Sequence, residues 1–239
     1  MKFVKKLMVL SVLSFNVIVG SFTSMADTSY NVNPSNIQYV IDHCNDSANN
    51  RVILNMAPGT YNSIKCYSPV RERYISLIGE NVDTVLVASH SGIYDDPAAM
   101  LRINGEVKNI TFTAYQSTGK VNLNDKGAYA IHADYGSQHT VFENCKLISY
   151  QSAALGMGMT PQSQVTLRNC TLKNLSNPEK YDTPYWRLGA LYAHSAIDGT
   201  NNKNSNLRLV GCVTEAPEGA YGKVTVQDLH GLHIDYVNV

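Results

Sequence analysis

One short pattern recurs four times along this chain of 239 residues, and it constrains the fold more than any other feature. In each copy an Asn or a Gly follows a run of strand-forming residues and precedes Ile or Cys. The spacing fits a coil of roughly two dozen residues, with loops inserted into two of the coils. The copies place Asn109, Asn144, Asn169 and Gly211 in one column, followed by Ile110, Cys145, Cys170 and Cys212.

Repetition at this period, through short strands and without long helices, is typical of a solenoid. We therefore predict an all-β fold, a right-handed parallel β-helix in which equivalent side chains of successive coils stack about 4.8 Å apart. Stacked Asn side chains can hydrogen-bond at each turn, and the thiols fill an interior column as compact hydrophobic groups. A metal or redox cluster is the alternative for these thiols, but no C-x-x-C spacing accompanies them.

Residues 1–26 are predicted to be a signal peptide, which leaves residues 27–239 as a single β-helix domain. Three lysines precede an apolar stretch, and "SMA" at residues 24–26 fits a cleavage site. An uncleaved membrane anchor is the alternative, but the apolar stretch is shorter than the roughly 20 residues that span a bilayer. We expect a secreted protein, extracellular or periplasmic, with no membrane association after cleavage.

A short amphipathic helix is expected to cap the N-terminal end of the β-helix. In "NPSNIQYVIDHC" the apolar residues Ile37, Val40, Ile41 and Cys44 follow helical spacing, and the preceding Pro and Ser supply start signals. Export would also permit a disulfide between Cys44 and Cys66.

The charge balance argues against two classes of partner. Lys and Arg together number 19, as do Asp and Glu, so the net charge is zero. Such a chain has no long-range attraction for nucleic acid or for an anionic membrane. Charged residues make up only 16% of the chain, which favours a β-rich surface of neutral polar groups.

A second pair of similar segments predicts a functional face. "AYAIHAD" at residues 128–134 and "ALYAHS" at residues 190–195 align with His132 over His194. Strand alternation divides these residues between the two sides of the sheet. The expected interior residues are Tyr129, Ile131, Leu191 and Ala193, and the expected outward residues are Ala130, His132, Tyr192 and His194.

This outer face is predicted to form a groove for an extended ligand. Gly156 and Gly158 would leave a floor without side chains, and the aromatic loop at residues 174–189 could form one wall. Tyr192 could stack on a sugar, and Arg102 could pair with a uronate carboxylate. Alternatively, the histidines are ordinary surface residues; a zinc site would need a third ligand. The catalytic candidates are His132, His194 and Asp134, and the substrate-binding candidates are Arg102, Asn104, Trp186, Arg187 and Tyr192.

The N-terminal half resembles a known family. "NIQYVIDHC", "RVILNMAPGTY" and "YISLIGENVDTVLV" are similar to the entrance of pectin methylesterases and of the wider pectin lyase-like β-helix superfamily. The likeness continues through "NITF", "GAYAIHAD" and "FENCKLISYQS", and it covers residues 33–153. These motifs are shared by many β-helix proteins, so the resemblance implies the fold more than an activity.

The catalytic acids of pectin methylesterases are not matched. The resemblance places Gln151 at their oxyanion-stabilising Gln, which makes it a further substrate-binding candidate, but Ser152 stands where they have a general-acid Asp. A hydroxyl cannot exchange a proton near neutral pH as that carboxyl does. The coil "QVTLRNCTL" has no acid at the place of their nucleophilic Asp, and their Gly-Arg-x-Trp segment has no counterpart. Esterase chemistry by that mechanism is therefore disfavoured.

Other enzymes of the same fold remain possible. A polysaccharide lyase would use Ca²⁺ to neutralise a uronate, and Asp134, Asp182 and Asp198 could approach one another to hold it. No calcium motif is visible, so no cofactor is expected unless the protein is a lyase. Asp95 and Asp96, the only adjacent acidic pair, fit a loop turn better than a hydrolase site.

Two functions from different classes remain. The first is an exported β-helix that interacts with an acidic extracellular polysaccharide, without established catalysis. The alternative is an active polysaccharide lyase, glycoside hydrolase or pectinesterase-like enzyme that uses the His132 and His194 face. The last strand, "LHIDYVNV", ends without a cap, and an open edge invites pairing. We expect either an end-to-end homo-oligomer or a truncated version of a longer β-helix.

Overall fold

A computed structural model of the chain describes residues 27–89, 97–114, 129–133, 139–150, 152–176, 189–195, 205–218, 224–227 and 233–237. The predicted signal peptide lies outside these residues. Within them, no helix has both the length and the apolar character needed to cross a membrane.

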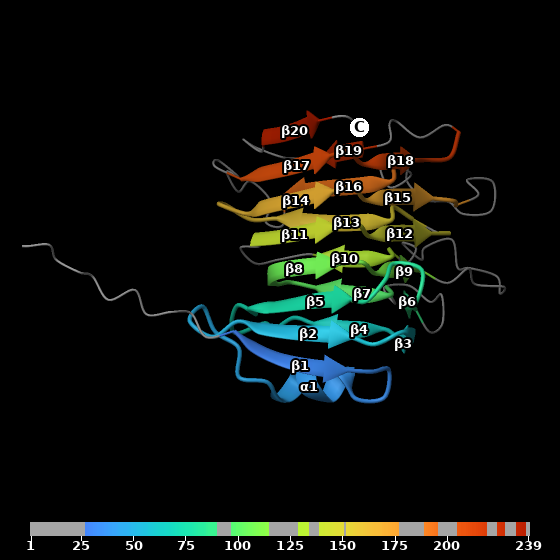
Figure 1. The fold of residues 1–239 in the computed structure, drawn as a ribbon. Helices are drawn as coiled ribbons and strands as arrows, with labels where there is room; N and C mark the ends of the chain where they lie inside the picture. Colours follow the sequence, from blue (N-terminus) through green and yellow to red (C-terminus); the bar gives the residue numbers. More distant parts are fainter. Residues whose placement is uncertain are drawn as a thin grey trace, which may run out of the picture.

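Three parallel sheets make up the molecule, and the chain visits them in turn as it rises from coil to coil (Figure 1). We call them sheet 1, sheet 2 and sheet 3. Sheet 1 contains β1 (Thr28–Val32), β2 (Val52–Met56), β5 (Ile75–Gly79), β8 (Asn104–Lys108), β11 (His139–Glu143), β14 (Gln164–Arg168), β17 (Asn206–Val210) and β20 (His233–Val237).

The other two sheets follow sheet 1 in each coil. Sheet 2 contains β3 (Gly59–Asn62), β6 (Val85–Ala88), β9 (Thr111–Thr113), β12 (Lys146–Ser149), β15 (Thr171–Asn174) and β18 (Val213–Glu215). Sheet 3 contains β4 (Ile64–Cys66), β7 (Ala99–Leu101), β10 (Ile131–Ala133), β13 (Leu155–Met159), β16 (Leu191–Ser195) and β19 (Val224–Gln227). This arrangement confirms the predicted right-handed parallel β-helix (Figure 1).

The corner between sheets 1 and 2 is built by the repeated Asn column. Asn109, Asn144 and Asn169 have φ values of 57°, 52° and 52°, and Gly211 has a φ of 60°. Asn and Gly are the residues that adopt this left-handed conformation most readily, which explains why the column contains no other type. The backbone N–H groups of Asn109 and Asn144 donate to Glu143 and Arg168 in the next coil, so the column is confirmed.

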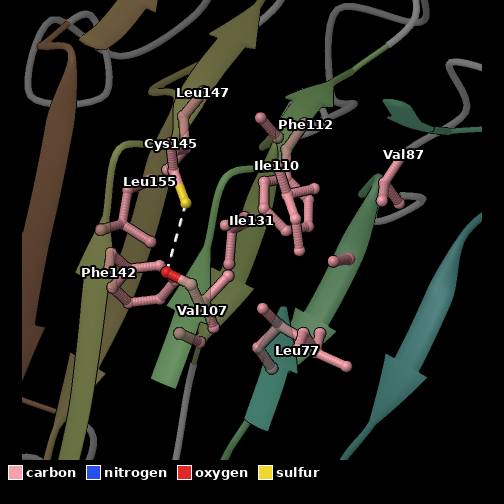
Figure 2. Close-up of a cluster of buried hydrophobic side chains, with 14 of the residues drawn as sticks. Leu77, Val87, Val107, Ile110, Phe112, Ile131, Phe142, Cys145, Leu147 and Leu155 are labelled. Atoms are coloured by element: carbon pink, nitrogen blue, oxygen red, sulfur yellow. Dashed lines mark hydrogen bonds between the residues drawn. The ribbon is translucent and has the colours of Figure 1, made fainter. Parts of the chain in front are cut away.

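The residue after each of these corners points into the core. Figure 2 shows Cys145 among Ile110, Phe142 and Leu147, with its thiol donating to the carbonyl oxygen of Val107 at 3.3 Å. Cys145, Cys170 and Cys212 are all buried and free, which agrees with their predicted role as small apolar groups.

The disulfide considered for Cys44 and Cys66 is not formed; both thiols are free. The Cys44 thiol donates instead to the carbonyl oxygen of Ile41 at 3.5 Å and accepts from the Arg73 guanidinium at 3.6 Å. Burial raises the pKa of the Cys66 thiol to about 12, so this group stays protonated.

Helix α1 (Ile37–His43) covers the N-terminal end of the coils, as predicted (Figure 1). Ile37 and Ile41 are buried in the main core, and Val40 packs against it. Gln38 faces the free edge of β4 and binds the backbone of Lys65 twice: its side-chain amide donates to the carbonyl oxygen at 2.9 Å and accepts from the N–H at 3.0 Å. The side chain of Gln38 thus takes the place of a neighbouring strand.

A buried ion-pair cluster joins this end of the molecule to sheet 1. The carboxylate of Asp46, with no exposed surface, accepts from Arg71 at 2.7 Å, from Arg73 at 3.0 Å and from the backbone N–H of Tyr74 at 2.7 Å. Arg73 also donates to the carbonyl oxygen of Ile41 at 2.6 Å. Burial alone would raise the pKa of Asp46, but these hydrogen bonds and charges outweigh it and hold the pKa below its ordinary value.

Candidate functional site

The outer face of sheet 3 carries His132, Tyr192 and His194, but in a different register from the predicted one. His132 on β10 aligns with Gly156 on β13, which aligns with Tyr192 on β16. His194 aligns with Gly158, two residues further along the same strands. The expected stacking of His132 over His194 is therefore wrong by two residues, and the two histidines are not in one column.

This register sets the distance between the histidines. They lie two strands apart and two residues apart along the strand direction. With about 4.8 Å between strands and about 3.3 Å per residue, their Cα atoms are about 12 Å apart. They share the outer face but do not converge on one point.

Inside sheet 3 the predicted alternation holds for most residues. Ile131, Leu191 and Ala193 belong to the main core, as expected. Tyr129 and Ala130 are exchanged relative to the prediction, because Ala130 is in the core while Tyr129 is not. Residue 130 forms a bend before β10 begins at Ile131, so strand alternation does not extend back to these two positions.

Tyr129 covers the glycine that was expected to form an open floor. A Cβ placed on Gly156 would lie 2.6 Å from the Tyr129 ring. Together with Ala153 and Tyr192, Tyr129 forms a small buried cluster separate from the main core. The groove floor predicted at Gly156 is therefore filled by an aromatic ring, and only a glycine leaves room for that ring.

Each tyrosine of this cluster contacts one of the histidines. The ring centroids of Tyr129 and His132 are 5.2 Å apart, and those of Tyr192 and His194 are also 5.2 Å apart, with the second pair stacked. Tyr192 is only 5% exposed and Tyr129 only 6%, whereas both histidines are partly exposed. The tyrosines therefore support the histidines, and the imidazole rings are the groups that a ligand could reach.

Ser152, which the resemblance placed at a catalytic acid, is fully buried in the turn that leads into β13. Its backbone N–H donates to the hydroxyl of Ser149 at 3.1 Å, and its own hydroxyl has no hydrogen-bond partner among the described residues. A buried hydroxyl of this kind offers no proton-exchanging group to a bound substrate.

Arg102 and Asn104 do not share one face. The guanidinium of Arg102 lies over the ring of Tyr67, 4.9 Å from its centroid, at the β4 and β7 end of sheet 3. Asn104 is instead the first residue of β8 in sheet 1, where its amide donates to Glu72 at 3.1 Å and accepts from the N–H of His139 at 2.9 Å. Asn104 was misplaced because the chain turns between sheets 3 and 1 inside "LRIN".

Six predicted residues lie outside the described part of the chain. They are the catalytic candidate Asp134, the substrate-binding candidates Gln151, Trp186 and Arg187, and Asp182 and Asp198 of the calcium hypothesis. Within the described part of the chain, no group of three or more His, Cys, Asp or Glu residues is arranged to hold a metal ion.

Sequence reasoning missed Lys65, Met100 and Tyr67 on this face. Lys65 aligns with Met100, which aligns with His132, so these two residues and His132 belong to one outer column. The ring of Tyr67, two residues after Lys65, makes the cation–π contact with the Arg102 guanidinium. The buried-exposed-buried pattern of β4, with Ile64 and Cys66 inside, was the signal that could have assigned Lys65 to the outer face.

Comparison with known proteins gives matches in structure alone. No protein-family model matches the chain, and no curated protein matches it. A carrot pectin methylesterase is 12% identical with a TM-score of 0.40, over 86% of this chain and 62% of that one. A pectin methylesterase in complex with a hexasaccharide is 12% identical with a TM-score of 0.45, over 77% and 62%. A pectate lyase is 13% identical with a TM-score of 0.37, over 80% and 64%.

These structures are of the kinds that the sequence motifs resemble, the pectin methylesterases and other pectin lyase-like β-helix proteins. The chain spans less than two thirds of the length of each of them. The fold of this chain is established by its own three parallel sheets.

Proposed function

We propose that this protein is an exported β-helix that binds an acidic extracellular polysaccharide across the strands of sheet 3. The observation that carries the proposal is the pair of Tyr–His contacts on the outer face, at Tyr129 with His132 and at Tyr192 with His194. Aromatic rings with a few polar atoms are what carbohydrate and other small-molecule sites commonly present. The class of ligand is taken from the resemblance of the N-terminal motifs to pectin-active proteins.

The shape of the face favours an extended ligand. Sheet 3 has six strands, and its outer residues repeat every interstrand step of about 4.8 Å. A polymer that crosses the strands therefore meets a new outer position of sheet 3 at each coil. The half-exposed imidazoles can donate or accept hydrogen bonds with sugar hydroxyls, while the buried tyrosines fix the orientation of the rings.

Binding is a better account of this face than catalysis by paired histidines. The register places His132 and His194 two strands and two residues apart, in different outer columns with about 12 Å between their Cα atoms, so the strands do not pair the two histidines. Ser152 supplies no acid at the place where the resemblance required one. An active lyase, hydrolase or esterase remains the alternative, and it is tested alongside binding.

Affinity electrophoresis of the purified protein in gels that contain pectate, alginate or a neutral glucan tests the proposal. We expect an acidic polysaccharide to retard the protein and the double variant His132→Ala/His194→Ala to bind about tenfold more weakly. His43→Ala is the matched control, because His43 also stacks on a tyrosine, Tyr39, but on α1.

Two results would overturn the proposal: no retardation by any of the polysaccharides, or equal retardation of the double variant. The same samples are assayed for unsaturated ends, reducing ends and methanol. Turnover that disappears in the double variant would favour the alternative, in which the protein is an active lyase, hydrolase or esterase.

A further inference from the structure

A cavity of about 670 Å³ opens beside the N-terminal end of sheet 3. Gln38 and Asp42 line it from α1, and Asn62, Lys65 and Tyr67 line it from β3, β4 and the segment that follows. Its lining combines these polar side chains with the Tyr67 ring and Pro69, a mixture that suits a hydroxylated ligand with apolar ring faces.

The walls of this cavity are held in place by hydrogen bonds. Gln38 is fixed by its two bonds to the backbone of Lys65, and its amide also donates to the carboxylate of Asp42 at 2.9 Å. Because Ile64 and Cys66 point into the core, the side chain of Lys65 between them must point outward. Hydrogen bonds therefore fix the wall of the cavity that α1 and β4 form together.

The charges around the cavity favour an anion. Lys65 is exposed and forms no ion pair with any described residue, and the guanidinium of Arg102 lies over Tyr67 at the same end. Asp42 is the one acidic residue of the lining, and an oxygen of its carboxylate already accepts from Gln38. A lysine and an arginine near one another bind carboxylates through charge-assisted hydrogen bonds.

The cavity is continuous with the face already described. Lys65, Met100 and His132 follow one another in a single outer column, so two strand spacings, about 10 Å, separate Lys65 from His132. A ligand that crosses the strands from the Tyr–His pairs can therefore reach the cavity without leaving sheet 3.

We propose that this cavity is a second subsite of the polysaccharide site, in which Lys65 and Arg102 bind the carboxylate of a uronic-acid residue and the amide of Asn62 binds its hydroxyls. The inference rests on the proposed function, because it assumes a glycan on sheet 3. It assigns recognition of the ligand's negative charge to Lys65 and Arg102. It also predicts that this end of the face responds to the carboxylates of the ligand, while the Tyr–His end responds to its sugar rings and hydroxyls.

Calorimetric titration with a galacturonic acid hexamer and with its fully methyl-esterified form tests this subsite, since esterification replaces each carboxylate by a neutral methyl ester on the same sugar chain. We expect Lys65→Ala and Arg102→Gln each to weaken binding of the charged hexamer about tenfold and to leave the esterified hexamer within about twofold. Lys173→Ala is the matched control, because it removes a lysine from the outer face of sheet 2, where Lys173 pairs with Glu215.

The outcomes separate the two proposals. If His132→Ala/His194→Ala weakens both hexamers but Lys65→Ala and Arg102→Gln change neither, the subsite is wrong while the proposed function stands. Equal losses with Lys173→Ala would also overturn the subsite, because they would reflect net charge alone. If the wild-type protein binds neither hexamer, the subsite fails as stated; the polysaccharide panel then decides the proposed function separately.

Discussion

His132 and Tyr192 lie in one outer column of sheet 3, with Gly156 between them. The glycine leaves a space that the ring of Tyr129 fills, and Tyr129 in turn contacts His132. The two Tyr–His pairs are thus connected through a residue that has no side chain. This relationship makes Gly156 the position at which the face is most sensitive to change.

Gly156→Ala should displace the Tyr129 ring and destabilise the protein. The added Cβ would lie 2.6 Å from that ring, which is too close for the two to coexist. Overpacking of this kind costs about 1–3 kcal/mol, measured as the change in the free energy of unfolding in urea. In the Tyr129→Ala background the same substitution should cost much less, because the ring is gone. Equal costs in both backgrounds would show that Tyr129 does not fill this space.

Asp46→Asn should be strongly destabilising. It removes the negative charge and one of the two oxygens that accept from Arg71 and Arg73, and Arg73, whose side chain is only 7% exposed, would remain buried without a charged partner. Breaking a buried pair costs about 3–5 kcal/mol. Asp83→Asn is the control, because Asp83 pairs with Lys146 on the surface, where such a pair contributes at most about 1 kcal/mol. Similar losses in the two variants would contradict the structural role of Asp46.

The same cluster predicts how stability depends on pH. The pKa of Asp46 is lower in the folded protein than the 3.8 of an unperturbed carboxyl. Its contribution to stability is therefore complete above pH 3.8 and is lost as the pH falls through the folded-state pKa. Urea titrations on the acid side should show a shallower decline for Asp46→Asn than for the wild-type protein. Parallel curves would mean that Asp46 is not linked to folding.

The Asn column predicts a difference between two substitutions at one residue. Asn169 has a φ of 52° and is exposed, so Asn169→Ala should cost about 1 kcal/mol through backbone strain. Asn169→Gly should be close to neutral, because Gly211 occupies the same column one coil later with a φ of 60°. Thermal unfolding of both variants checks this. Equal losses would show that the Asn side chain, and not the backbone conformation, matters there.

This column was also the part of the fold that the sequence made most predictable. Four successive coils have a left-handed corner followed by a buried Ile or Cys, so Asn or Gly recurs at the corner regardless of the loops between the coils. The helix α1 was predictable for a similar reason, since its apolar spacing matches the buried residues Ile37 and Ile41. Both features follow from local requirements.

The register of sheet 3 was not predictable in the same way. Its strands are three to five residues long, and nothing in them must repeat from coil to coil. The prediction aligned His132 with His194 and ignored the bend at residue 130. In the structure His132 aligns through Gly156 with Tyr192, so the predicted register of β10 and β16 was wrong by two residues. Pairing of strands in space depends on loop lengths that no local rule fixes.

The five cysteines should all be reduced, and four of them should be protected in the folded protein. Cys66, Cys145, Cys170 and Cys212 are almost completely buried. The contact with Cys145 contributes most to the raised pKa of Cys170, about 12, which leaves little reactive thiolate near neutral pH. Iodoacetamide followed by mass spectrometry should modify these four only after denaturation. Fewer than five modified thiols in guanidinium would reveal a disulfide.

The most direct test of the central claim follows the histidine rings by NMR while an acidic oligosaccharide is added. The ring signals are assigned with single His→Gln variants. We predict that the signals of His132 and His194 shift with the bound fraction, while that of His43, which stacks on Tyr39 at the N-terminal end, stays unchanged. Saturable binding that leaves His132 and His194 unperturbed would contradict a glycan site on the outer face of sheet 3.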